Sequence, residues 1–404
     1  MFELHPDELL DRVQALPAAR PLLARLENPA GIYLVGGAVR DVLLGGRPFD
    51  LDLVVEGDAA AAAASLGGEL TVHDRFGTST VRLDGFTYDI ARARRETYAH
   101  PGALPDVTPA PLDEDLLRRD FTVNALAIAL RGGQLHAAPN GVEDLEAGRL
   151  RVLHDRSFID DPTRLLRMAR YASRLGFEIE PHTRRLADDA VRARALGTVS
   201  GPRLGAELRL LAREQDPVRA LLALRELGLD AALHPGFGLR DEGLARRALE
   251  LLPDDARPDR LVLAVASTGV PAGELPALLD ALAFEASDRD AIVAAATRSG
   301  DVAGNLVDAD APSQIAAAAA GAPAELVALA GALGPERQAR EWLEDLRHVH
   351  LSIDGRDLLA AGVPEGPAIG RGLRAALAAK LDGEATGREQ ELAVALGAAA
   401  GSPG

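Results

Sequence analysis

The sequence predicts an α/β N-terminal part with a small mixed sheet, followed by an all-helical remainder. Two observations carry this prediction. Between residues 32 and 91, short apolar runs of strand type alternate with glycine turns and short helical patterns. From about residue 216 onward, the pattern is one of short amphipathic helices interrupted by proline and glycine.

Length and composition favour a globular protein of several domains. The 404 residues suffice for two to four domains, and 47% of them are hydrophobic. Cysteine is absent, which excludes disulfides and thiolate metal sites. No apolar run reaches the roughly 18 residues of a membrane span, and the first ten residues do not resemble a signal peptide. We therefore expect a cytoplasmic protein without a membrane partner.

The charge of the chain is uneven. A net charge of −17 argues against nucleic-acid binding over the whole surface. Residues 149–213, however, contain 14 Arg against 8 Asp and Glu, a local excess of positive charge. This segment is the candidate RNA-binding track.

The predicted elements follow one another closely in the first 91 residues. Residues 1–30 form a helical lead-in, and the strand Ile32–Val35 ends at two glycines. We expect a helix over Val39–Leu44, a strand over Phe49–Val55, a helix over Ala59–Leu66, and strands over 69–73, 78–83 and 86–91.

Two aspartates lie in the second predicted strand. Asp50 and Asp52 are two residues apart, which puts both carboxylates on one face, roughly 7 Å apart along the strand. Carboxylates held together repel each other, and a cation beside them resolves the repulsion. A small number of oxygen ligands suits Mg²⁺, which completes its shell with water and phosphate. The alternative is a solvated strand, on which this pattern is common.

The preceding glycine turn predicts a phosphate site. Gly36 and Gly37 allow backbone N–H groups to approach a phosphate at the start of a helix, and Arg40 adds a charged donor. A glycine pair after a strand is also a common simple turn. In order and within 20 residues, however, the turn and the two aspartates favour metal-assisted phosphoryl or nucleotidyl transfer.

The next segment combines a polar stretch with an apolar one. Residues 92–116 are rich in proline and charge, and we expect a long loop. An Arg-Arg-Asp triple then precedes an apolar run that we expect to be a helix, in which Phe121, Val123 and Leu126 face the core. Asp89 is either a third carboxylate near the metal or a polar residue at the sheet edge.

A helix over 160–175 carries the second strong signal. Asp161 and Pro162 are good helix-start residues. Arginines 164, 167, 170 and 174 form one stripe of this helix, and they lack acidic partners on the same stripe. The stripe is either a solvated face or a site for an anion.

These motifs resemble one known family. GGAVRD at 36–41, DLDLVV at 50–55 and DDPTR at 160–164 are similar to the signatures of class II tRNA nucleotidyltransferases and bacterial poly(A) polymerases, within the polymerase-β-like superfamily. The resemblance extends over the whole chain and is densest over 32–211. It implies a nucleotidyltransferase head (1–148), a neck with a nucleotide-template helix (149–215), a helical body (216–345) and a helical, tRNA-binding tail (346–404).

The resemblance also implies roles for the residues. Asp50 and Asp52 are the catalytic, Mg²⁺-binding pair, and Gly36, Gly37, Arg40 and Arg119 bind the nucleotide. Asp161 and Arg164 select the base, because cytosine and adenine each offer an amino donor beside a ring-nitrogen acceptor. Arg167 and Arg170 match positions that also contact the nucleotide, while Arg203 and Glu207 brace the neck.

The expected function is Mg²⁺-dependent addition of CMP and/or AMP, from CTP and ATP, to the 3′ end of tRNA. The partners are the 3′ end and acceptor stem of tRNA, with no protein partner evident. Four alternatives remain open: an A-adding specialist, a CC-adding specialist, a poly(A) polymerase, and a non-catalytic RNA-binding relative. A poly(A) polymerase usually carries a basic C-terminal extension, which the SPG ending does not show.

Overall fold

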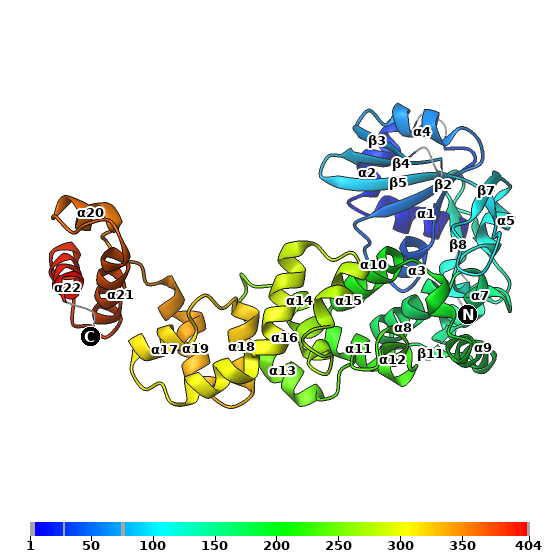
Figure 1. Ribbon diagram of the computed structural model, residues 1–404. Coiled ribbons are helices and arrows are strands. Elements are labelled where there is room, and N and C mark those ends of the chain that lie inside the picture. Colours follow the sequence, from blue (N-terminus) through cyan, green and yellow to red (C-terminus); the bar gives the residue numbers. More distant parts are fainter. Residues whose placement is uncertain (1–4, 27–28, 74–76, 402–404) are drawn as a thin grey trace. The chain divides into compact units, whose positions relative to one another are not determined.

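A computed structural model describes residues 5–26, 29–73 and 77–401. The chain divides into two compact units (Figure 1), Met1–Glu207 with Glu226–Ala232, and Leu208–Arg225 with Leu233–Gly404. This division falls inside the expected neck. The finer separation into head, neck, body and tail therefore stays a prediction.

The first unit contains a seven-stranded mixed sheet, as expected for its N-terminal part. The strand order is β3-β4-β5-β2-β1-β8-β9, in which β2 and β5 are parallel and the other neighbours are antiparallel. Its strands are β1 (Ile32–Val35), β2 (Leu51–Val55), β3 (Glu69–His73), β4 (Thr78–Leu83), β5 (Phe86–Arg92), β8 (Leu126–Ala129) and β9 (Leu135–Ala137).

Helices support this sheet at the positions that the sequence predicts. They are α1 (Pro6–Gln14), α2 (Ala19–Arg25), α3 (Gly37–Leu43) and α4 (Ala59–Ser65). Helix α3 begins directly after β1 because Gly36 adopts φ +70°, a conformation that glycine tolerates. The buried Tyr88 of β5 donates a hydrogen bond from its hydroxyl to the carbonyl of Ala18, 2.7 Å away, and so ties the sheet to the helical lead-in.

Strand β2 is shorter than expected. It begins at Leu51, so Phe49 and Asp50 precede it in a bend. The alternation holds over Leu51, Asp52 and Leu53, of which only Asp52 is exposed, and it ends at Val54, which is buried as well. Phe49 is 70% exposed and stacks on Phe86, so it is not part of the core.

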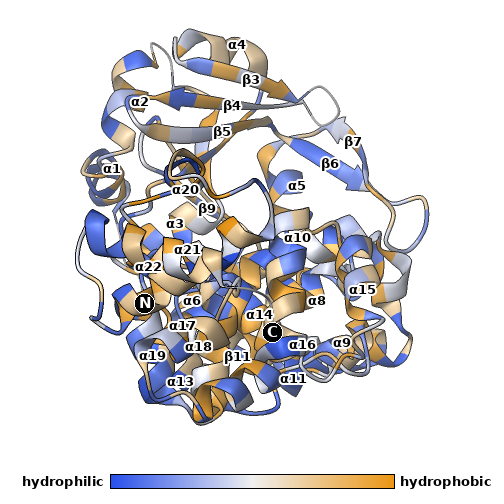
Figure 2. Cartoon of the chain, turned by 60° about the vertical axis from the view of Figure 1, so that its left-hand side comes forward, coloured by the Kyte–Doolittle hydropathy of each residue, from blue (hydrophilic) through white to orange (hydrophobic). Residues whose placement is uncertain are grey.

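The prediction of a long loop over 92–116 is wrong. The structure contains a hairpin of β6 (Arg94–Thr97) and β7 (Asp106–Pro109), followed by α5 (Leu112–Leu117). Strand β6 is hydrophilic throughout (Figure 2), so it has no apolar alternation that would predict a strand. Its charges are instead paired, with Glu96 accepting from both Arg94 and Arg118.

The prediction of a helix after the Arg-Arg-Asp triple is also wrong. The chain forms a short 3₁₀ turn, η2 (Thr122–Asn124), and then strand β8, which pairs with β1. Phe121, Val123 and Leu126 are fully buried, as expected. Short apolar runs suit a buried strand or a buried helix equally, and the pairing with β1 decides between them here.

The helix with the arginine stripe begins three residues later than expected. Helix α7 (Ser157–Asp160) has Asp161 as its C-cap residue, and α8 (Thr163–Leu175) begins two residues later. The N-cap residue of α8 is Pro162 rather than the expected Asp161, but Oδ1 of Asp161 still accepts from the backbone N–H of Thr163 at 3.1 Å. The remaining elements of this unit are α6 (Gly141–Glu146), β10 (Arg149–Leu150), β11 (Glu178–Ile179), α9 (Pro181–Arg192) and η3 (Ala195–Thr198).

Three helices, α10 (Gly201–Ala212), α11 (Pro217–Glu226) and α12 (Leu229–Leu233), contain residues of both units. The helices of the second unit are α13 (Glu242–Leu251), α14 (Pro258–Ser267), α15 (Leu275–Ala281), α16 (Ala286–Val307), α17 (Pro312–Ala318), α18 (Ala324–Ala332), α19 (Glu336–Glu344), η4 (Leu346–His348), α20 (Gly355–Ala360), α21 (Pro367–Leu381) and α22 (Arg388–Ala400). The described part of this unit is helical, as expected. Among the described helices of the chain, none has the length and apolarity needed to cross a membrane.

Candidate active site

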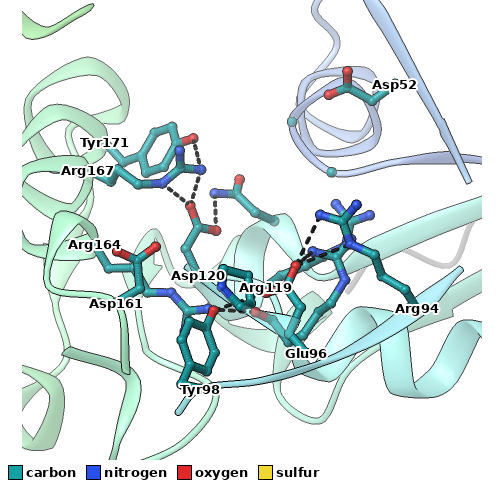
Figure 3. Close-up of a pocket in the computed structure, with 15 residues that line it drawn as sticks. Asp52, Arg94, Glu96, Tyr98, Arg119, Asp120, Asp161, Arg164, Arg167 and Tyr171 are labelled. Atoms are coloured by element: carbon teal, nitrogen blue, oxygen red, sulfur yellow. Dashed lines mark hydrogen bonds and ion pairs between the residues drawn. The ribbon is translucent and has the colours of Figure 1, made fainter. Parts of the chain in front are cut away.

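A pocket of about 350 Å³ lies within the first unit (Figure 3). Strand β2, the turn after β1, the β6–β7 hairpin and helix α8 all contribute to it. Its lining residues are Gly36, Gly37, Asp52, Arg94, Glu96, Tyr98, Pro105, Arg118, Arg119, Asp120, Asn124, Asp161, Arg164, Arg167 and Tyr171. Seven of the ten predicted site residues are therefore brought together, and Asp50, Arg40 and Arg170 are not among the lining residues.

Carboxylates gather on the sheet side of the pocket. Asp52 on β2 lies opposite Asp89 in the parallel register of β5, so both side chains are on the same face. Asp89 accepts a 2.6 Å hydrogen bond from the Thr80 hydroxyl of β4. The pKa of Asp52 is raised to about 6, by partial desolvation first, then by the charges of Asp89 and Asp50, while Arg119 opposes the rise.

This donor set fits a divalent cation. The groups are carboxylate oxygens whose mutual repulsion a cation would relieve. In the described residues, no three His, Asp or Glu side chains are arranged to hold a metal ion by themselves. A metal bound at Asp50 and Asp52 would therefore draw the rest of its ligands from water and from the phosphates of a substrate.

The glycine turn and Arg119 form the next part of the wall. A Cβ atom on Gly36 would lie 2.9 Å from Nη1 of Arg119, so only glycine lets this guanidinium approach the turn. Nη2 of Arg119 donates to the buried Asp115 at 3.0 Å, and its buried Nε has no hydrogen-bond partner in the described part of the chain. A cation with spare donors beside a glycine turn suits a phosphate group.

Arg40 is placed differently from the sequence prediction. It is only 2% exposed, and it lies behind the wall rather than in the lining. Its Nη1 donates to Oδ1 of Asn124 at 2.6 Å, and its Nε donates to Asp41 at 2.8 Å. The guanidinium also lies 5.5 Å from the ring centre of Tyr171. Asn124, not Arg40, lines the pocket.

Asp161 and Arg164 lie at the start of α8, on the opposite side of the pocket from Asp52 (Figure 3). Oδ1 of Asp161 accepts from the Thr163 hydroxyl at 2.6 Å and from Arg203 at 2.8 Å, in addition to the backbone N–H at position 163. Its Oδ2 has no hydrogen-bond partner among the described residues. Arg164 is held by the Ser157 hydroxyl and the carbonyl of Arg118, both at 2.7 Å.

Two arginines of the α8 stripe, Arg167 and Arg170, are paired with acids from elsewhere in the chain. Arg167 donates to Asp120 through Nε at 2.9 Å and Nη2 at 2.6 Å, and to Glu207 at 3.1 Å. Arg170 donates to Glu207 at 3.3 Å. Burial would raise the pKa of Asp120, but the Arg167 charge and the hydrogen bonds prevail and lower it to about 2. The acids that the stripe lacks locally come from sequence-distant positions.

Sequence reasoning missed one further group of lining residues. Tyr98 donates to Glu96 at 3.0 Å, and Glu96 also accepts from Arg118 at 2.9 Å and from Arg94 at 3.1 Å. The charged sequence Arg-Arg-Glu at 94–96 is the available signal, but without an apolar face it does not predict a strand.

The protein resembles known proteins over different lengths. A family profile described as the poly A polymerase head domain matches residues 32–151. An A-adding tRNA nucleotidyltransferase from Halalkalibacterium halodurans is 43% identical over 55% of this chain and 54% of its own. Another from Geobacter sulfurreducens is 42% identical over 57% of this chain and 26% of its own. The chain thus spans about half or less of these two relatives.

Other relatives match over nearly their whole length. A CC-adding tRNA nucleotidyltransferase from Deinococcus radiodurans is 36% identical over 89% of this chain and 88% of its own. The solved structure of a CCA-adding enzyme in an apo form superposes with a TM-score of 0.82 at 28% identity, covering 98% of this chain and 99% of the other. Fold, pocket and sequence agree on one class, that of the nucleotidyltransferases. The chain belongs to the class II tRNA nucleotidyltransferase family, whose members generally use a divalent metal.

Proposed function

We propose that the protein adds CMP and/or AMP, from CTP and ATP, to the 3′ end of tRNA. The observation that carries this proposal is the single pocket in which Asp52, the Gly36–Gly37 turn with Arg119, and the Asp161/Arg164 pair face one another. These are the groups that a nucleotidyl transfer with base selection requires: a metal-binding carboxylate, a phosphate site and a base-edge site.

In this proposal, Asp50 and Asp52 hold Mg²⁺, which would neutralise the triphosphate and acidify the primer 3′-hydroxyl. Gly36, Gly37 and Arg119 bind the phosphates. The 3′-oxygen of the tRNA forms a bond to the α-phosphorus, the bond to the β-phosphate oxygen breaks, and pyrophosphate leaves. Asp89 is fixed beside Asp52 by Thr80, which supports its assignment to the same carboxylate cluster.

Asp161 and Arg164 would choose the base. The Oδ2 atom of Asp161 accepts from the amino group of cytosine or adenine, and Arg164 donates to the ring nitrogen beside it. Guanine and uracil present these groups in the reverse order, so both protein groups would remain unpaired. Arg203 supports the choice, because it shares Oδ1 of Asp161 and leaves Oδ2 to the base.

Arg167 and Arg170 would have different roles in the site. Arg167 lines the pocket and has N–H groups beyond those used by Asp120 and Glu207, so it can contact the nucleotide. Arg170 is 6% exposed and does not line the pocket, so its place is to hold Glu207.

The relatives support tRNA as the acceptor but differ in the nucleotides they add. Their names include A-adding, CC-adding and CCA-adding enzymes, and structures of similar CCA-adding enzymes contain tRNA, CTP or ATP. The chain is more identical to the A-adding relatives but matches more of the CC-adding one. A cytoplasmic location, where tRNA is processed, belongs to the same proposal.

The deciding experiment offers the purified protein three tRNA transcripts that end in the discriminator base, in C, and in CC. Each is incubated with Mg²⁺ and with CTP, ATP or both. Extension of all three to one CCA end indicates complete CCA addition. Extension of only the CC-ended transcript indicates an A-adding enzyme, and a stop at CC indicates a CC-adding one. Long adenylate ladders would favour a poly(A) polymerase, and no product would contradict the proposal.

A further inference from the structure

A buried polar chain connects helix α3 with helix α8. It starts at Arg40 in the first turn after Gly36–Gly37 and passes through Asn124 and Asp120 to Arg167. Arg40, Asn124 and Asp120 are 2%, 5% and 6% exposed. Four side chains from three separate parts of the sequence therefore form one hydrogen-bonded series, in which Arg40 lies behind the pocket wall and the other three line the pocket.

The amide of Asn124 has only one favourable orientation in this series. Its Oδ1 accepts from Arg40 at 2.6 Å, and its Nδ2 donates to Oδ1 of Asp120 at 3.0 Å. The flipped amide would set its NH₂ group against the guanidinium and its oxygen against the carboxylate. Both contacts would be repulsive, so two opposite charges fix the orientation.

The carboxylate of Asp120 is saturated by the protein itself. Oδ1 accepts from the amide of Asn124 and from the backbone N–H of Phe121, at 3.0 and 2.8 Å. Oδ2 accepts two N–H groups of Arg167. The second N–H of the Asn124 amide, by contrast, is not needed by Asp120, and Asn124 lines the pocket.

We propose that Arg40 is a positioning residue that acts through Asn124 and Asp120, and that Asn124 contacts an oxygen of the bound nucleotide. The inference rests on the proposed function and deepens it. In this arrangement Arg40 does not touch the phosphates. It fixes the donor direction of Asn124 and, through Asp120, the position of Arg167, so the glycine turn and the template helix keep one mutual geometry.

A double-mutant cycle tests the coupling. The values of kcat/KM for CTP and ATP are measured for Arg40→Met, Asn124→Ala and the combined variant, on the transcripts that the wild type extends. Each single change is expected to lower kcat/KM by about 10- to 100-fold. The combined variant is expected to have the same kcat/KM as the less active of the two single variants. Additive losses would show that Arg40 acts independently of Asn124 and would overturn the proposal.

The matched control is Arg47→Met, which removes an exposed arginine from the turn after α3. It is expected to retain wild-type kinetics and melting temperature. If the wild type itself adds no nucleotide to any transcript, the proposed function fails. If the wild type is active and the losses are additive, only the role of Arg40 fails.

A second variant remains informative if Arg40→Met does not fold. Asn124→Asp keeps the acceptor for Arg40 but places a carboxylate oxygen 3.0 Å from Asp120. A proton shared by the two carboxylates would restore a donor between them. The activity of the variant, relative to the wild type at the same pH, is therefore expected to rise as the pH is lowered from 8 to 6. A ratio that does not change with pH would overturn the proposal, because a merely structural role would not titrate.

The nucleotide oxygen that Asn124 contacts belongs either to the sugar or to the phosphates. Equal use of CTP and 2′-deoxy-CTP by Asn124→Ala, with discrimination in the wild type, would identify the sugar hydroxyl. Equal losses with both nucleotides, together with weaker inhibition by pyrophosphate, would identify the phosphates. Unchanged KM values and unchanged pyrophosphate inhibition would contradict the contact.

Discussion

Asp52 and Asp120 line the same pocket, but their surroundings drive their pKa values in opposite directions. Beside Asp52 lie two more aspartates, and its pKa rises to about 6. Beside Asp120 lies Arg167, and its pKa falls to about 2 although it is the more buried of the two. The difference comes from the partners rather than from burial.

The comparison separates two kinds of carboxylate in one site. The Asp52 side carries negative charge that the protein leaves uncompensated, which is the arrangement that a metal and a triphosphate complete. The Asp120 side is compensated internally and shapes the wall against which the substrate binds. Loss of Asp52 should therefore affect chemistry with little effect on folding, whereas loss of Asp120 should affect folding as well.

The largest expected effect is that of Asp52→Asn. The change removes the proposed metal ligand, and we expect kcat/KM for nucleotide addition to fall by at least about 100- to 1000-fold. Because the raised pKa shows that the ionised form is disfavoured in the fold, the melting temperature at pH 8 should stay the same or increase. Asp84→Asn is the control, since φ +52° at this turn position suits asparagine, and it should behave as wild type. An active Asp52→Asn enzyme would contradict the assignment.

The second effect concerns stability. Asp120→Asn leaves Arg167 with Glu207 as its remaining charge partner, and urea denaturation should show a loss of about 3 kcal/mol in the free energy of unfolding. Because Asp120 stays ionised down to about pH 2, its contribution is present above the ordinary carboxyl pKa and is lost only in strong acid. The loss should thus be similar at pH 5 and pH 8. A variant as stable as the wild type would remove the contrast with Asp52.

The third effect concerns base choice. Asp161→Ala removes the proposed acceptor for the base amino group, and the preference for CTP and ATP over UTP and GTP should fall by about 100-fold. Single-turnover rates with all four nucleotides give this ratio directly. A variant that incorporates the correct base more slowly but just as selectively would show that Asp161 does not read the base.

The fourth effect is the pH dependence of the wild type. Since Asp52 must be ionised to bind the metal and its pKa is raised to about 6, activity should decline as the pH falls below about 6, by about 10-fold for each unit. High Mg²⁺ should move this decline to lower pH, because the cation favours the ionised form. A profile that is flat down to pH 4.5 at low Mg²⁺ would contradict the environment described for Asp52.

The smallest effect tests the hairpin. Tyr98→Phe removes one hydrogen bond to Glu96 while Arg94 and Arg118 still hold that carboxylate. A loss of about 1 kcal/mol in unfolding free energy is expected, measured by thermal or urea denaturation. A larger loss of activity than of stability would indicate that the Tyr98 hydroxyl also contacts the substrate.

The parts predicted from the sequence are those whose signals are local. A four-residue apolar run, two glycines and alternating aspartates lie within 20 residues, and they predict β1, the turn and the face of Asp52 correctly. The local hydrogen bond of Asp161 is similar, because its carboxylate accepts from the backbone N–H of Thr163, two residues further on, although α8 itself begins later than predicted. For these elements, neighbouring residues supply both the pattern and the structure.

The sequence predictions are wrong where residues far apart in the sequence determine the local structure. Strand β6 is polar, and it forms because β7 pairs with its backbone while Glu114 of α5 and Arg118 after α5 neutralise its charges. Arg40 looks like a phosphate ligand in sequence, but Asn124, 84 residues further on, draws it behind the wall. The apparently unpaired arginines of α8 likewise find Asp120 and Glu207, 47 and 40 residues from Arg167. Local pattern gives no information about such partners.

The contact between Gly36 and Arg119 has a consequence for how this site changes over time. A Cβ atom at position 36 would lie 2.9 Å from the guanidinium, and the positive φ would strain any larger residue. A smaller side chain at position 119 would make room but would remove the proposed phosphate ligand. Each substitution is therefore costly while the other residue remains. The two positions should therefore drift only as a pair, and random mutagenesis with selection for activity should return both residues unchanged.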